Sequence, residues 1–109
     1  MKLIKTIVRP NKVDEVRDAL QKLNVSGMTV TEVRGHGHQK GHTAIYRGQE
    51  YNVSLLPKME IEVVVADSIV EETIQAIIRA ARTGEIGDGR VFVMPVTESY
   101  KIRTGELEG

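Results

Sequence analysis

The sequence predicts an α+β sandwich, with two helices on one face of a four-stranded sheet. Apolar residues recur at helical spacing in two segments, 13–23 and 70–81, and four other short segments are rich in β-branched residues. Their order along the chain is strand, helix, strand, strand, helix, strand. Two such halves of similar length are typical of the ferredoxin-like βαββαβ arrangement, here in a single domain over residues 1–109.

The first half begins with Lys2–Val8, a short apolar segment that predicts a buried strand. Asn11 is placed to cap the helix that follows. The apolar stripe of this helix consists of Val13, Val16, Leu20 and Leu23. Asn24 and Gly27 are expected to end it, and Met28–Arg34 predicts the second strand.

A long segment between the second and third predicted strands, residues 36–57, shows neither helical nor strand periodicity. Stretches of this length without regular structure are uncommon in compact domains unless they have a function. We therefore expect a projecting loop that contacts partners. The strand Lys58–Ala66 follows, with Ile61, Val63 and Val65 on one face.

The second helix is preceded by Ser68 and Glu71, which have the spacing of a capping box, and Gly84 is expected to end it. Its predicted buried face consists of Val70, Ile74, Ile77, Ile78 and Ala81. The last main strand is predicted over Arg90–Val96, and residues 97–109 are expected to form a C-terminal loop.

The composition excludes several classes of function. The formal net charge is zero, so general nucleic-acid binding, which needs a basic surplus, is not expected. The chain has no cysteine, and therefore no disulfide or thiolate chemistry. The first predicted strand starts at Lys2, with no signal peptide before it, and no apolar run reaches transmembrane length. We expect a cytoplasmic protein that meets a membrane only through a partner.

The most informative motif covers residues 83–93, Thr-Gly-Glu-Ile-Gly-Asp-Gly-Arg-Val-Phe-Val. Glycines let backbone N–H groups approach an anion closely, and Arg90 adds a fixed positive charge beside them. The spacing is not that of a Walker loop. A Gly-Asp-Gly sequence before a strand is usually only a turn, so this motif by itself does not predict an anion site.

Four other segments change that interpretation. They are Gly35-His36-Gly37-His38-Gln39-Lys40-Gly41, Tyr46-Arg47-Gly48-Gln49-Glu50-Tyr51, Leu56-Pro57-Lys58 and Lys101-Ile102-Arg103-Thr104-Gly105. The two cations of the last segment occupy alternate positions, so they would point to the same side of an extended chain. With the 83–93 motif, these segments make the chain resemble the PII family of nitrogen-regulatory signal proteins, essentially from end to end.

The resemblance implies a homotrimer that binds ATP or ADP in the clefts between neighbouring subunits. The residues that match the nucleotide-binding positions are Gly35, Gly37, His38, Gly87, Asp88, Gly89 and Arg90, with Lys101 and Arg103 supplied by the next subunit. Arg90 stands where the family usually has lysine and Lys101 where arginine is common, which can retune the preference for ATP over ADP. His38 replaces a frequent arginine, so one phosphate contact would depend on pH.

The resemblance also implies that 2-oxoglutarate is the effector and binds beside Mg-ATP. Gln39 would give its side-chain oxygen to Mg²⁺, and Lys58 would pair with a carboxylate of 2-oxoglutarate. The backbone of Lys40 and Gly41 would help to hold this ligand. Without the surrounding pattern, Gln39 and Lys58 would be interpreted as solvated residues at strand ends.

The long loop carries the residues that would meet partners. Tyr51, expected at the loop tip, matches the tyrosine that many bacterial members have uridylylated, although a loop tyrosine can also simply pack on a partner. Arg47 is expected to contact a channel-like partner, and Ser54 stands where the family often has aspartate. The histidines His36, His38 and His42 do not have the spacing of a standard Zn²⁺ or Cu²⁺ site and are interpreted as loop composition.

Two helices can cover only one face of the sheet, and the apolar residues of the other face predict an oligomer. The predicted function is that of a signal transducer, not an enzyme, which senses ATP or ADP and 2-oxoglutarate and regulates partners through the long loop. The resemblance implies an ammonium channel, glutamine-synthetase-modifying enzymes or other nitrogen regulators as partners. The alternatives are a PII-like trimer with a different small ligand, a trimeric metal-tolerance-type protein, and a slow ATP hydrolase.

Overall fold

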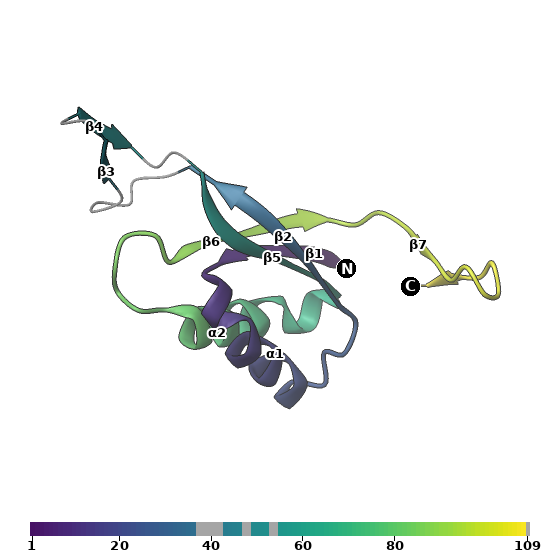
Figure 1. Ribbon diagram of the computed structural model, residues 1–109. Coiled ribbons are helices and arrows are strands. Elements are labelled where there is room, and N and C mark those ends of the chain that lie inside the picture. The colour runs from purple at the N-terminus through teal and green to yellow at the C-terminus, as the bar shows by residue number, and fades with distance from the viewer. Residues whose placement is uncertain (37–42, 47–48, 53–54, 109) are drawn as a thin grey trace.

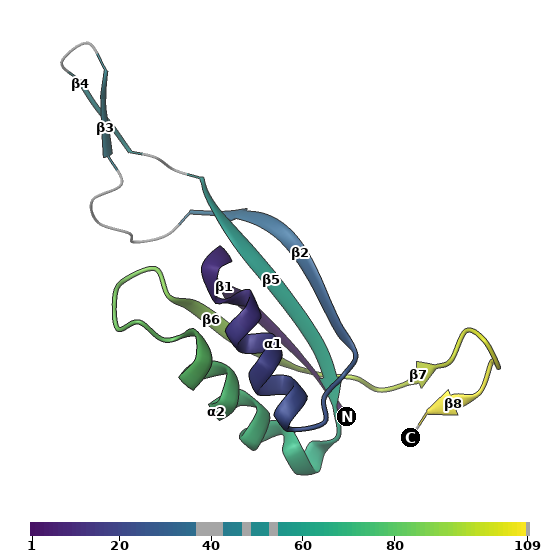
Figure 2. The same cartoon turned by 60° about the horizontal axis from the view of Figure 1, so that its bottom comes forward.

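The computed structural model describes residues 1–36, 43–46, 49–52 and 55–108. Its body is an antiparallel sheet with the strand order β2-β5-β1-β6, and the helices α1 and α2 lie side by side on one face (Figures 1 and 2). The bounds are β1 Lys2–Val8, α1 Val13–Lys22, β2 Met28–Gly35, β5 Leu56–Val65, α2 Val70–Ala81 and β6 Gly89–Pro95. This confirms the predicted α+β sandwich. No helix of the described segments is long and apolar enough to cross a membrane.

Two short hairpins lie outside this sheet. One is formed by β3, Thr43–Tyr46, and β4, Gln49–Asn52, within the segment predicted to have no regular structure. Tyr51 is expected at the loop tip, but in this hairpin it is paired with Ala44 within β4 and does not lie at the turn. The other hairpin, β7 Ser99–Tyr100 with β8 Leu107–Glu108, extends away from the body of the molecule (Figure 1).

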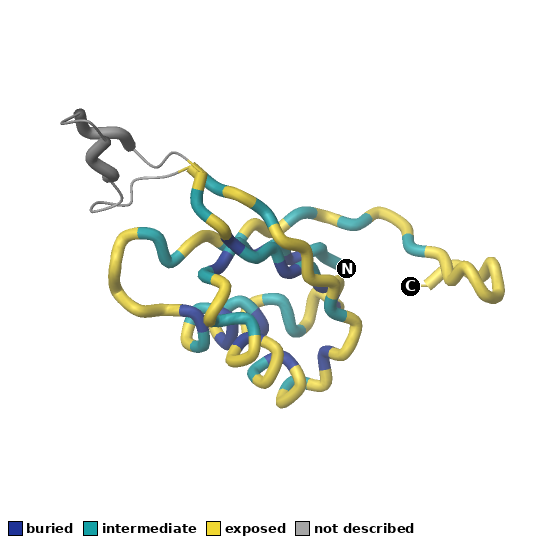
Figure 3. The backbone as a smooth tube through the Cα atoms, viewed as in Figure 1, coloured by how far each residue is buried: buried dark blue, intermediate teal, exposed yellow. Residues whose placement is uncertain are grey.

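The hydrophobic core lies between the sheet and the two helices, where the buried residues gather in Figure 3. The side chains of Ile61, Val63 and Val65 all face this core, as the alternation of β5 predicts. Its other large members come from β1 and the helices and are Ile4, Val8, Val16, Leu20 and Ile77. Burial of each large aliphatic side chain stabilises the fold by about 1.5–3 kcal/mol.

The prediction from the sequence is wrong for the start of α1 and right for its end. Asn11 does not cap the helix, because Pro10 starts a 3-10 turn that runs to Lys12 and leads directly into α1. The C-terminal prediction is confirmed: Asn24 has a positive φ of 60°. The N–H of Val25 donates to the carbonyl of Leu20 at 3.0 Å, and the N–H of Asn24 donates to Gln21 at 3.0 Å, which is a Schellman ending.

Both predicted ends of α2 were wrong. Ser68 lies in a 3-10 turn, Asp67–Ile69, and makes no capping box with Glu71. The helix ends at Ala81, before Gly84, because Arg82 is already extended. The N–H of Gly84 instead donates to the carboxylate of Asp88, in the loop that follows the helix. Gly84 therefore belongs to this loop and does not end the helix.

The face of the sheet opposite the helices is apolar at one end and charged at the other. At the apolar end, Leu3 is paired with Val64 on one side and Met94 on the other. Val64 is 47% exposed, and the neighbouring Phe92 is 45% exposed. Toward the other end the same face carries Lys5 and Glu60, joined by an ion pair of 3.7 Å. The expectation of apolar residues on the open face is confirmed, but only for part of it.

Gly89 is the position where the fold requires a glycine most strictly. Its φ is +109°, and a Cβ atom would lie 1.7 Å from the backbone oxygen of Ile7. We predict that Gly89→Ala lowers the free energy of unfolding by about 3 kcal/mol or more, since positive φ and steric overlap add. The matched control is Gly84→Ala, which also has a positive φ but meets no atom within 4 Å. Urea unfolding that gave equal losses for the two variants would contradict this account.

Candidate functional site

The pairing of three neighbouring strands brings three charged residues to the same end of the sheet. Val8 is paired with Met59 of β5 on one side and with Gly89 of β6 on the other. One step further along each strand, Arg9 is therefore level with Lys58 and Asp88. Pro10 follows Arg9 directly, and the extended backbone of Arg9, with ψ of 143°, is the conformation that a residue before proline prefers.

Asp88 is the centre of the loop between α2 and β6. Its carboxylate accepts hydrogen bonds from the Thr83 hydroxyl, from the Thr83 N–H at 2.9 Å and from the Gly84 N–H at 2.8 Å. Arg9 donates to the same carboxylate at 3.2 Å through Nε, and its Nη2 donates to the carbonyl of Ile86 at 3.0 Å. These contacts close the segment 83–88 into a ring and attach it to the end of β1.

The hydrogen bonds around Asp88 favour its ionised form. Partial burial raises the pKa of this carboxyl, but the hydrogen bonds from Thr83, Gly84 and Arg9 outweigh burial and hold the pKa well below its usual range. Asp88 is therefore a carboxylate that the loop itself neutralises. Its hydrogen-bond partners are Thr83, Gly84 and Arg9.

Lys58 joins the root of the long loop to this ring. It lies near the start of β5, opposite Val33 of β2, and its side chain is buried. The ammonium donates a hydrogen bond of 2.8 Å to the carbonyl oxygen of Gly87. Burial lowers the pKa of Lys58, the charge of Arg9 lowers it further, and the carboxylate of Asp88 acts in the opposite direction.

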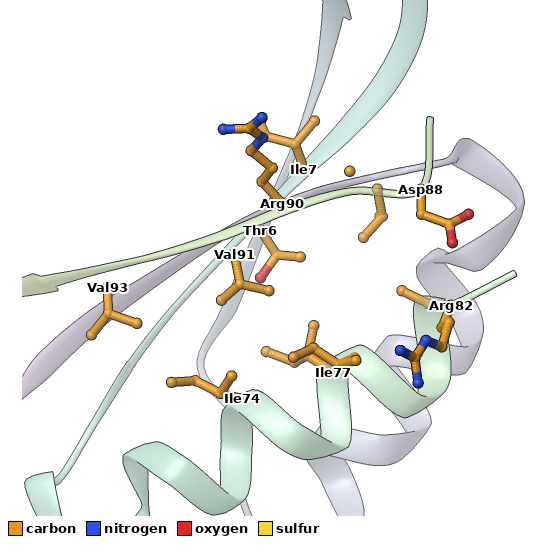
Figure 4. Close-up of a pocket in the computed structure, with 13 residues that line it drawn as sticks. Thr6, Ile7, Ile74, Ile77, Arg82, Asp88, Arg90, Val91 and Val93 are labelled. Atoms are coloured by element: carbon orange, nitrogen blue, oxygen red, sulfur yellow. The ribbon is translucent and has the colours of Figure 1, made fainter. Parts of the chain in front are cut away.

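The structure brings together some of the predicted site residues. Gly35, at the end of β2, lies beside Lys58, whose Cγ is 3.5 Å from where a Cβ of Gly35 would be. The predicted nucleotide positions Gly87 and Asp88 lie in the loop that Lys58 contacts, and Gly89 starts β6. Arg90 follows in β6 and points to the open face of the sheet (Figure 4). One end of the sheet therefore carries Gly35, Lys58 and the loop residues together.

Lys101 and Arg103 do not join this group within one chain. They lie in the hairpin β7–β8, at the opposite end of the molecule from the loop between α2 and β6 (Figures 1 and 2). The predicted extended segment was wrong here. The N–H of Gly105 donates to the carbonyl of Lys101 at 2.7 Å, so the two cations are carried by a turn.

The remaining predicted residues lie outside the described segments. They are Gly37, His38, Gln39, Lys40, Gly41, His42, Arg47 and Ser54. Of the three histidines weighed as a metal site, the structure describes His36 alone. Within the described segments, no group of three or more His, Cys, Asp or Glu side chains could hold a metal ion.

The sequence interpretation missed Arg9 and the role of Thr83. Arg9 is one residue beyond the first strand, and its importance depends on the register of two other strands. A hydroxyl residue five positions before an aspartate in a glycine-rich segment was a signal for Thr83, because short polar side chains often close such loops.

A family model described as Nitrogen regulatory protein P-II matches residues 1–106. The chain belongs to the P-II family. The Nitrogen regulatory protein P-II of Azospirillum brasilense is 57% identical to it over 109 residues, 100% of this chain and 97% of the relative. The same protein of Rhizobium etli is 52% identical over 108 residues, 99% and 96% of the two chains. Nitrogen regulatory protein P-II 1 of Escherichia coli is 56% identical over 106 residues, 97% and 95% of the two chains.

Membership of the P-II family makes this chain a nitrogen regulatory protein and a signal transducer, not an enzyme. This agrees with the prediction from the sequence. It also decides against the metal-tolerance alternative, because the family model covers nearly the whole chain. In this P-II protein, the hydrogen bonds that Asp88 accepts hold the loop 83–88 in its conformation.

The ionised form of Asp88 predicts a pH dependence of stability. Because its pKa is lowered by folding, its contribution is complete above the pKa of the unfolded chain, about 4, and is lost as pH falls through the lowered folded pKa. We predict that Asp88→Asn lowers the free energy of unfolding by about 2 kcal/mol at pH 7, the scale of hydrogen bonds to a charged group. The difference from wild type should shrink below about pH 4.

Urea titrations between pH 7 and pH 2.5 measure this difference. The matched control is Asp14→Asn, in an exposed carboxylate that pairs with Arg17 at 3.2 Å and is 80% exposed. Its effect should stay within about 0.5 kcal/mol. A pH-independent gap between Asp88→Asn and wild type would show that the charge of Asp88 is not what stabilises the loop.

Proposed function

We propose that this P-II protein senses ATP or ADP together with 2-oxoglutarate and reports their levels to partners through the long loop. The observation that carries the proposal is the hydrogen bond of 2.8 Å from Lys58 to the carbonyl of Gly87. It connects the root of the long loop with the loop that matches the family's phosphate-binding segment. A ligand that binds to one of these two loops would therefore change the affinity of the other loop for its own ligand.

The contact explains how an anion could change the shape of the site. A carboxylate of 2-oxoglutarate is a stronger acceptor for a buried ammonium than a peptide carbonyl is. When the carboxylate accepts a hydrogen bond from Lys58, the bond from Lys58 to the carbonyl of Gly87 breaks. The backbone between Gly87 and Gly89 can then turn its N–H groups toward a phosphate. Binding of the two ligands is then coupled, and the coupling is the signal.

Mg²⁺ and the second ligand would be held by residues from the predicted loop root. Gln39 would give its side-chain oxygen to the metal, and the backbone of Lys40 and Gly41 would hold the oxoacid. A divalent cation of this kind supplies charge that binds ATP phosphates and the oxoacid at once. The contribution of His38 would fall as pH rises through the range in which imidazole loses its charge.

The arrangement of cations supports a homotrimer with nucleotide sites between subunits. Lys101 and Arg103 lie on a hairpin that extends from the body, whereas Arg90 is in the first part of β6, at the other end of that strand from the hairpin (Figure 1). The hairpin also exposes Ile102 fully and Leu107 to 60%. Apolar side chains at these positions, and the apolar end of the open sheet face, are satisfied when neighbouring copies cover them.

The regulated partners would be an ammonium channel, glutamine-synthetase-modifying enzymes or other nitrogen regulators. The hairpin β3–β4 is the part of the long loop that such partners would meet, and Arg47 and Tyr51 would be its contact residues. Uridylylation of Tyr51 would add a charged nucleotide to β4 and change the set of partners.

The coupling predicts reciprocal calorimetry. Mg-ATP should bind about tenfold more tightly when 2-oxoglutarate is present, and 2-oxoglutarate should gain by the same factor when Mg-ATP is present. Lys58→Ala should remove the coupling while leaving ATP binding measurable, since Arg90 and the glycine loop remain. Lys5→Ala, on the same face of the sheet, is the matched control. Coupling that persists in Lys58→Ala would contradict the proposal, and ATP binding with no response to 2-oxoglutarate would indicate a different effector.

The oligomer predicts a separate result. We expect wild-type protein to sediment as a trimer and Phe92→Glu to dissociate, because a charge would replace an apolar side chain that is 45% exposed in one copy. The control is Glu72→Lys, a charge change on the exposed surface of α2. Sedimentation equilibrium would exclude this interface if Phe92→Glu stayed trimeric at micromolar concentration.

A further inference from the structure

A groove lies between α2 and the edge strand β6, on the helix side of the sheet (Figure 4). Its volume is about 350 Å³. The aliphatic side chains of Ile74 and Ile77 form one wall, and those of Val91 and Val93 form the other. β6 is the last strand of the sheet, so no further strand of the described chain closes this side.

Thr6 places a buried polar side chain beside the groove. The side chain of Thr6 is 2% exposed, and its hydroxyl has no hydrogen-bond partner within the described residues. Figure 4 shows Thr6 directed from β1 toward Ile74 and Ile77 of α2. A hydroxyl left without a partner in an apolar setting costs about 1–3 kcal/mol, so it favours any molecule that brings an oxygen to it.

A cation stands at the mouth of the same groove. Arg82 follows α2 directly, lines the groove, and forms no ion pair with the described residues. Asp88, also at the rim, already accepts hydrogen bonds from Thr83, Gly84 and Arg9. At the mouth of the groove, Asp88 thus has partners within the protein, whereas Arg82 could pair with the negative charge of a ligand.

The groove adjoins the proposed nucleotide site but opens on the helix side of the sheet. Side chains alternate along β6, so Val91 and Val93 face α2 while Arg90 points to the open face of the sheet (Figure 4). The lining of the groove includes Asp88, Gly89 and Arg90, which also belong to the proposed nucleotide site, so the two sites meet at the start of β6. A molecule in the groove would thus contact Asp88 and Gly89 of the nucleotide loop from the helix side of the sheet.

We propose that this groove is a second small-molecule site, which takes an aliphatic carboxylic acid that carries a hydroxyl or keto oxygen on its chain. The carboxylate would pair with Arg82, the chain would lie between α2 and β6, and the second oxygen would meet the hydroxyl of Thr6. A water molecule occupies about 30 Å³ in the liquid, so the groove has room for roughly ten non-hydrogen atoms. An acid of about eight carbons is of this size.

Three probes separate the contributions of the two polar groups: octanoate, 1-octanol, and the series of octanoates with one hydroxyl group along the chain. Binding to the full-length protein is followed by NMR, which also locates it through the methyl signals of Ile74, Ile77 and Val91. We expect octanoate to bind about tenfold more tightly than octanol, as a charge-assisted contact allows. The best hydroxyoctanoate should exceed octanoate about fivefold, on the scale of one buried hydrogen bond.

Each preference should depend on one residue. Arg82→Gln should bring octanoate down to the affinity of octanol, whereas Arg79→Gln, the matched change on an exposed arginine of α2, should leave it unchanged. Thr6→Val keeps the shape of the side chain and should remove the preference for the hydroxyl group alone. The proposal is overturned if no probe binds saturably, if Arg82→Gln binds octanoate as wild type does, or if the shifted methyl groups belong to the open face of the sheet.

Discussion

The register of three antiparallel strands is the constraint on which the site depends. Because Val8 is paired with both Met59 and Gly89, three residues meet at one end of the sheet: Arg9 after β1, Lys58 in β5 and Asp88 just before β6. A slip of one residue would turn each side chain to the opposite face. The close contact of Gly89 with the backbone of Ile7 fixes this register, since no other residue fits there.

The chemistry of the site follows from how the charges are shared. Arg9 neutralises Asp88, and Asp88 in turn holds the amides that shape the loop. Lys58, in contrast, is satisfied by the neutral carbonyl of Gly87. Burial and, after it, the charge of Arg9 lower the pKa of Lys58, and the carboxylate of Asp88 opposes them only in part. Of the two cations, Lys58 is therefore the one whose hydrogen-bond partner carries no charge, which is why we propose it as the contact for an incoming anion.

Much of the fold could be predicted from local patterns. The strands and the apolar stripes of α1 and α2 follow from periodicity, and the end of α1 follows from Asn24. The starts of both helices could not be predicted, because Pro10 and Asp67 begin 3-10 turns that compete with side-chain capping. The hairpin β3–β4 was missed because its strands are four residues long and carry no clear alternation. Lys58 and the loop residues were found through resemblance, whereas Arg9 required the register of strands far apart in the sequence.

Lys58 links the root of the long loop to the loop around Asp88 through its hydrogen bond to Gly87. Amide hydrogen exchange of Thr83 and Gly84 measures the effect of this link, because both amides donate to Asp88. Without ligand, Lys58→Met should raise the exchange rates of these amides severalfold, and Lys5→Met should not. Addition of 2-oxoglutarate to the protein already saturated with Mg-ATP should change the exchange of the same amides in wild type and not in Lys58→Met. Equal exchange in wild type and Lys58→Met under both conditions would contradict the link.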